Sequence, residues 1–132
     1  MPRDASHLES AREWLRYAKS DLHLARAGRP DGVLWEMLAF HAQQAAEKAF
    51  KAVLVSCGVD FPPTHNLTVL RELLPTDIVL PEVVSDAAEL TVYAVASRYP
   101  EDMDDVTETD YRKAIEQAGA VLEWAAGIVF KE

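Results

Sequence analysis

Five polar side chains that could bind or pair charged groups share one helical stretch. Gln44, Lys48 and Lys51 recur at steps of four and three, so they line one side of a helix. Gln43 and Glu47 form a neighbouring row, and Glu47 precedes Lys51 by four residues, which is the favourable order for an ion pair. Two lysines and two glutamines suit a phosphate group or a base edge, but the same residues also suit an exposed face with routine ion pairs.

The surroundings of this polar stripe predict a buried helix. Alanine dominates the stretch, and no Gly or Pro interrupts it. Phe40, Phe50 and Leu54 flank the stripe, which favours a partner chain over open water as its neighbour. We therefore assign structural or interface roles to Phe40, Gln43 and Glu47, and ligand contacts to Gln44, Lys48 and Lys51.

Further candidates lie at predicted helix ends. Arg98 and Tyr99 precede Pro100; the arginine either caps the helix or presents its planar fork to a phosphate while Tyr99 stacks on a base. His65 precedes a short helix, where it either contacts an anionic ligand or satisfies loop backbone groups. His41, on the buried helix, is expected to be a satisfied core histidine.

Several kinds of chemistry lack their sequence pattern. The acidic run from Glu101 to Asp105 has neither the glycine nor the distal glutamate of a calcium loop, so a solvated loop is expected. Cys57 has no activating motif around it and is interpreted as structural. No phosphate-cradling glycine loop, metal cluster or nucleophile elbow is found. We expect no metal, no cofactor and no catalytic residue.

Helical periodicity runs through the 132 residues, and no alternating strand pattern interrupts it. A capping box at Ser6–Glu9 opens a helix that stops at Gly28, and the next helix follows Gly32 and ends at Cys57. Further helices are predicted up to Leu74 after a cap at Thr64 or Asn66, roughly from Glu82 to Ser97, and from a capping box at Thr107 to about Phe130. The chain is thus expected to be one all-α domain, residues 1–132, an antiparallel, mostly up-and-down bundle of four long helices with the short one in the longest crossover.

Composition and net charge limit the partners and the compartment that we expect for this protein. A formal net charge of −9 argues against a protein held to nucleic acid mainly through phosphate contacts, although a small basic patch is compatible with it. No apolar run reaches the roughly 18 residues of a membrane span, and no signal-peptide pattern is found. With one cysteine, a reducing cytoplasm is the expected compartment.

These residues, taken in order, resemble the HEPN (higher eukaryotes and prokaryotes nucleotide-binding) domain family over nearly the full length. The resemblance rests on Trp14 and Asp21, the run from Phe40 to Lys51, Thr64 through Leu67, and Tyr93 through Pro100. It implies a bundle similar to the C-terminal domain of kanamycin nucleotidyltransferase, usually a homodimer. Prokaryotic members are often encoded beside a minimal nucleotidyltransferase and thought to bind it, sometimes as a toxin–antitoxin pair.

The resemblance also raises the question of RNA cleavage, because many HEPN proteins are metal-independent ribonucleases. Those use an arginine, four to six residues and then a histidine on a late helix; here Arg98 is the best match and no histidine follows it. Arg16 and His23 have a similar spacing, but they lie on the first helix. We therefore expect a module that binds a nucleotide and a nucleotidyltransferase.

Two alternatives and the question of RNA stay open. In the first alternative, the protein is a ribonuclease in which Arg98 stabilises the phosphate and His41 or His65 transfers the proton. In the second, it is a structural dimer in which the stripe only holds the interface together. RNA remains an open partner.

Overall fold

The computed structural model describes residues 4–96 and 105–130, and all regular structure within them is helical. In chain order the segments are α1 (Ala5–Arg26), α2 (Trp35–Ser56), α3 (Leu67–Glu72), α4 (Glu82–Asp86), the 3-10 helix η1 (Ala87–Leu90), α5 (Thr91–Ala96) and α6 (Glu108–Val129). None of the described helices is long and apolar enough to cross a membrane.

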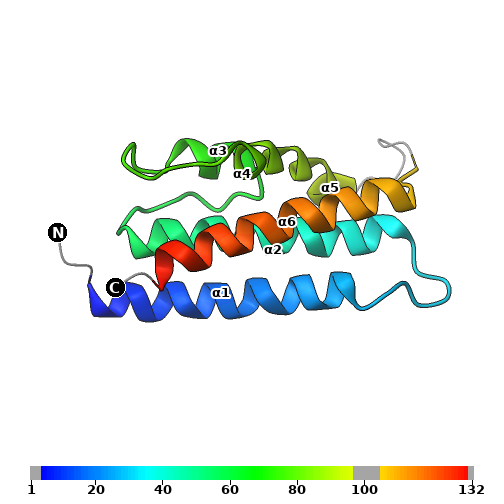
Figure 1. The fold of residues 1–132 in the computed structure, drawn as a ribbon, viewed down its shortest axis with the longest axis horizontal. Coiled ribbons are helices and arrows are strands. Elements are labelled where there is room, and N and C mark those ends of the chain that lie inside the picture. Colours follow the sequence, from blue (N-terminus) through cyan, green and yellow to red (C-terminus); the bar gives the residue numbers. More distant parts are fainter. Residues whose placement is uncertain (1–3, 97–104, 131–132) are drawn as a thin grey trace.

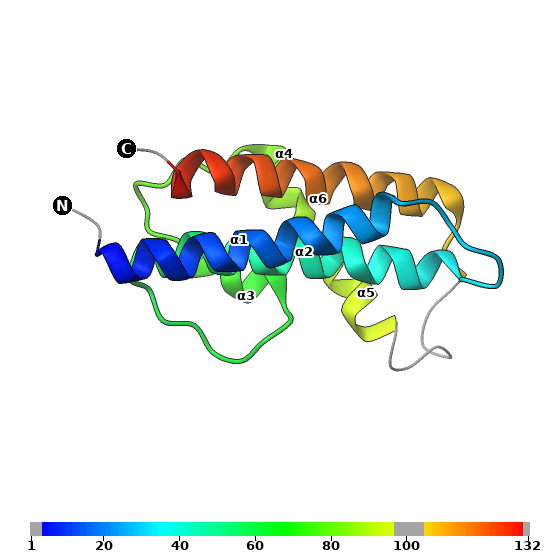
Figure 2. The same cartoon turned by 90° about the horizontal axis from the view of Figure 1, so that it is seen from below.

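The segments form the predicted antiparallel bundle. Figures 1 and 2 show α1, α2 and α6 side by side along the long axis, with α2 and α6 running opposite to α1. The segment 82–96 runs back in the direction of α1, and α3 lies in the crossover between α2 and that segment (Figure 1). The all-α, up-and-down fold class predicted from periodicity is therefore confirmed.

Helix α2 lies at the centre of the bundle, because it packs against α1, α3, η1, α5 and α6. Its alanines are fully buried, and such small side chains allow neighbouring helices to approach closely. Phe50 and Leu54 are also fully buried, and the Phe50 ring lies 5.5 Å from that of Trp124 on α6. These two residues do not flank a stripe that faces a partner chain, as the sequence suggested, because they fill the core of their own chain.

The helix ends follow local capping chemistry, with one correction. The predicted cap at Ser6 is wrong: Asp4 is the N-cap of α1, and its Oδ1 accepts from the Ser6 backbone N–H at 2.8 Å. The Ser6 hydroxyl also donates to this oxygen, and the hydroxyl first and the backbone N–H second lower the pKa of the Asp4 carboxyl. The capping box of α6 is confirmed, since Asp110 N–H donates to Thr107 Oγ1 at 3.1 Å and Thr107 N–H donates to Asp110 Oδ2 at 3.0 Å. Asn66 caps α3, as one of the two predicted caps.

The predicted fourth helix is present as three joined pieces, α4, η1 and α5. Where α4 passes into η1, the Arg71 guanidinium donates to the Ser85 carbonyl at 3.1 Å. That carbonyl thus has a partner outside the α-helical ladder, and the next turn tightens to 3-10 geometry. Periodicity alone could not indicate this contact, because Arg71 comes from α3, more than ten residues earlier in the chain.

Thr107→Ala removes one half of the α6 capping box. We expect the free energy of unfolding to fall by about 1 kcal/mol, because the N–H of Asp110 loses its partner. Urea unfolding followed by circular dichroism measures the loss. Thr109→Ala is the matched control, since Thr109 is exposed and caps nothing; an equal loss in both variants would contradict the role of the box.

Candidate functional site on helix α2

The carboxylate of Glu47 is the centre of the polar stripe, and its side chain is only 4% exposed. Lys51 Nζ donates to Glu47 Oε2 at 2.9 Å, and His65 Nδ1 lies 2.9 Å from Glu47 Oε1. Gln43 Nε2 lies 3.3 Å from the same Oε1 and donates to the His65 backbone carbonyl at 3.1 Å. Gln44 donates to Gln43 Oε1 at 2.7 Å. We call these five residues the Glu47 cluster.

The ammonium group of Lys51 is enclosed by aromatic rings as well as by Glu47. It lies 5.6 Å from the centre of the Trp14 ring and 5.4 Å from that of Phe61, and these two rings meet edge to face. A cation over an aromatic face gains electrostatic stabilisation when water is largely excluded. Lys51 is therefore neutralised and covered within the chain, which leaves it little charge for a phosphate.

Lys48 belongs to a different cluster, although it lies one turn from Lys51. Its Nζ donates to Asp21 Oδ2 on α1 at 2.6 Å, and His41 Nδ1 lies 3.2 Å from the other oxygen of Asp21. Lys48 also lies 5.9 Å from the centre of the Tyr17 ring. We call Asp21, His41 and Lys48 the Asp21 cluster; it fastens α2 to α1.

Sequence reasoning gave Asp21 no role in a site, because its partners are 20 and 27 residues away along the chain. Acidic residues are common on exposed helix faces, so its type alone carried no signal. Only the packing of α1 against α2 shows that Asp21 faces a lysine and a histidine.

The structure places the predicted site residues in different surroundings. The structure brings together Gln43, Gln44, Glu47, Lys51 and His65, and it places Lys48 with Asp21 instead. Phe40 is partly buried, with its ring centre 5.4 Å from that of His41. Arg98 and Tyr99 lie outside the described residues. Gln43 and Glu47 are buried by their own chain, so their burial requires no partner subunit.

The contacts of the two clusters stabilise the fold, and they leave few polar groups open to a ligand. Within the described ranges, every buried side-chain nitrogen and oxygen has a hydrogen-bond partner. The Glu47 cluster also fixes the connection 59–66 against α2, through the side chain and carbonyl of His65. No group of three or more His, Cys, Asp or Glu side chains in this part of the chain is arranged to hold a metal ion.

His65 keeps one group available to solvent. Its side chain is 51% exposed, and because Nδ1 faces Glu47, Nε2 is the nitrogen left to meet water or a ligand. A carboxylate that orients an imidazole in this way is a common arrangement in both structural and catalytic sites.

Glu47→Ala leaves the nearly buried ammonium of Lys51 without its counter-ion. We expect a loss of about 3 kcal/mol in the free energy of unfolding, since an unpaired buried charge is costly. The double variant Glu47→Leu with Lys51→Met should recover most of that loss, because it removes both charges and keeps the volume. Urea unfolding of the three proteins tests this; a single variant as stable as the unmodified chain would contradict it.

Comparison with known proteins agrees with this architecture. The chain matches the HEPN domain over residues 11–129. Among solved structures, it is similar to TT1696 from Thermus thermophilus, with 29% identity, a TM-score of 0.79 and coverage of 89% of this chain and 97% of that one. It is also similar to ST0689, an archaeal HEPN homologue, with 28% identity, a TM-score of 0.70 and coverage of 90% and 97%. None of the curated proteins matches. The match over most of its length establishes that this chain belongs to the HEPN domain family.

Proposed function

We propose that this HEPN domain is a binding module that does not cleave RNA. It binds a nucleotide and a minimal nucleotidyltransferase, it does so as a homodimer, and the two proteins form a toxin–antitoxin pair. The observation that carries this proposal is the pairing of the two α2 lysines: Lys48 contacts Asp21 and Lys51 contacts Glu47, so neither is left to stabilise a phosphate during cleavage.

Lysines paired in this way offer little charge to a phosphate. A nuclease needs an acid and a base within reach of the scissile phosphate, and a cation free to stabilise it. Here Lys48 and Lys51 are neutralised by Asp21 and Glu47. The sequence also has no histidine after Arg98.

The surface beside the clusters suits a protein partner. Tyr17 is 54% exposed next to Lys48, and with Trp14 it lines an apolar depression of about 220 Å³ on α1. Aromatic side chains in a depression with paired charges beside them are typical of interface centres. We therefore place the partner contact on the face that α1 and α2 share.

Tyr17→Ala should weaken binding of the minimal nucleotidyltransferase encoded by the same genome by about tenfold or more, because the central aromatic contact is lost. Calorimetry of the two purified proteins measures the affinity, and light scattering reports their stoichiometry. Val83→Ala is the control, since Val83 is an exposed apolar residue on α4. Absence of any complex with the unmodified chain would refute the partner.

The ribonuclease alternative has one observation in its favour, which is the half-exposed His65 oriented by Glu47. Purified protein incubated with total RNA in a metal-free buffer separates the two functions, and we expect no cleavage. Cleavage that disappears in His65→Ala but persists in His23→Ala would make the protein a nuclease, since His23 is an exposed histidine on α1 outside both clusters.

A further inference from the structure

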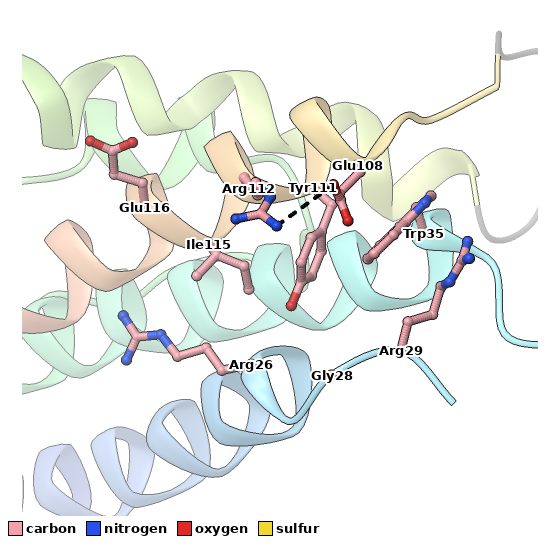
Figure 3. Close-up of a pocket in the computed structure, with 9 residues that line it drawn as sticks. All are labelled: Arg26, Gly28, Arg29, Trp35, Glu108, Tyr111, Arg112, Ile115 and Glu116. Carbon is pink, nitrogen blue, oxygen red and sulfur yellow. Dashed lines mark ion pairs between the residues drawn. The ribbon is translucent and has the colours of Figure 1, made fainter. Parts of the chain in front are cut away.

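A second concave site lies where α1 ends and α6 begins, away from both clusters. Its volume is about 570 Å³, within the range of small-molecule sites. Figure 3 shows residues from α1, the following turn, α2 and α6 around it. The lining residues are Arg26, Gly28, Arg29, Trp35, Glu108, Tyr111, Arg112, Ile115 and Glu116. We call this the arginine pocket.

Three arginines and two glutamates line the pocket, so its lining carries a formal charge of +1 in a chain whose net charge is −9. Arg112 lies 3.6 Å from Glu108, whereas Arg26 and Arg29 have no carboxylate partner among the residues that the structure describes. Figure 3 shows the Glu116 carboxylate turned away from Arg26. Two guanidinium groups thus remain available to an anion.

Contacts within the chain hold the wall of the pocket in place without a ligand. Tyr111 Oη donates to the Ala25 carbonyl at 2.5 Å, which ties the end of α1 to α6. Figure 3 shows Trp35 between Tyr111 and Arg29; its ring centre lies 4.8 Å from that of Tyr111 and 4.2 Å from the Arg29 guanidinium carbon. Because Trp35 is occupied by these neighbours, it offers no free face on which a base could stack.

Gly119 leaves room for the Arg26 guanidinium beside α6. A Cβ built on Gly119 would lie 2.6 Å from Arg26 Nη2, so a larger residue there would make this guanidinium, the end of a flexible and exposed side chain, move from its place against α6. Glycine is otherwise unfavourable inside a helix. Gly127, on the same helix, has no neighbour within 4 Å of its built Cβ, so it has no such role.

We propose that the arginine pocket binds the phosphate chain of a small polyphosphate ligand. Arg26 and Arg29 make the main contacts, and Arg112 contributes after leaving Glu108. The planar guanidinium fork matches phosphate oxygens in pairs. Figure 3 shows Arg26 and Arg29 on opposite sides of Tyr111, an arrangement that fits an extended chain of charged groups better than a single compact anion. This site uses no residue of the two clusters and does not depend on the nucleotidyltransferase partner.

Calorimetry on the full chain at low salt, without divalent cations, tests the pocket with inorganic triphosphate, ATP, adenosine and citrate. We expect triphosphate and ATP to bind with similar affinity and adenosine not to bind, because the phosphate chain carries the recognition. Similar affinities leave both inorganic polyphosphate and a nucleotide as sources, and a much tighter ATP would identify the nucleotide. The proposal would be overturned if neither triphosphate nor ATP gave a binding heat, or if citrate bound with the same affinity as triphosphate.

The variants locate the binding. Arg26→Ala and Arg29→Ala should each weaken triphosphate binding by about tenfold. Arg16→Ala is the charge-matched control and should change the affinity little, since Arg16 is an exposed α1 residue that pairs with Glu13. Gly119→Ala displaces the Arg26 guanidinium without removing it, so it should weaken binding less than Arg26→Ala does, whereas Gly127→Ala should leave binding unchanged. If Gly119→Ala fails to fold, the Arg26 and Arg16 pair decides; equal effects in that pair would mean general charge attraction and would refute the site.

Discussion

The enclosure of helix α2 is the constraint on which the rest of the structure depends. Neighbouring segments contact it on several sides, and most of its residues are buried. Any polar side chain on such a helix must find its partner inside the chain, because an unpaired buried charge is costly. Glu47 is partnered by Lys51 and His65. Lys48 is partnered by Asp21 from α1. The clusters thus determine how α1 and the connection 59–66 sit on the central helix.

The same constraint means that the polar residues that stabilise the fold are different residues from those left to recognise a ligand. Where α2 is enclosed, its lysines are already neutralised by carboxylates. The groups beside them that stay exposed are about half of the His65 side chain and the aromatic surface near Tyr17. Where α1 ends, the enclosure stops, and Arg26 and Arg29 are left with no carboxylate partner in the described part of the chain. A negatively charged protein can therefore still present a local site for an anion, because screening limits the reach of its distant carboxylates.

Prediction from the sequence succeeded where the signal was local. Apolar spacing placed the helices, and the pattern at Thr107 and Asp110 identified a capping box that the structure contains. Prediction was less successful where two nearby patterns competed: Ser6 resembled a cap, but Asp4 lies just before it and offers a carboxylate that accepts from the first-turn N–H. The polar stripe was recognised as significant, yet its division into two clusters was not, since Asp21 lies on another helix.

By itself the sequence determined the all-α bundle, the buried central helix and the HEPN resemblance, because periodicity, capping and motif order are properties of neighbouring residues. Only the tertiary structure decided which charges meet. It paired Lys48 with Asp21 and left Arg26 against Gly119, contacts between helices that no spacing along the chain indicates. The physical reason is that a charge is neutralised or left available by what packs against it, and packing is settled only when the helices come together.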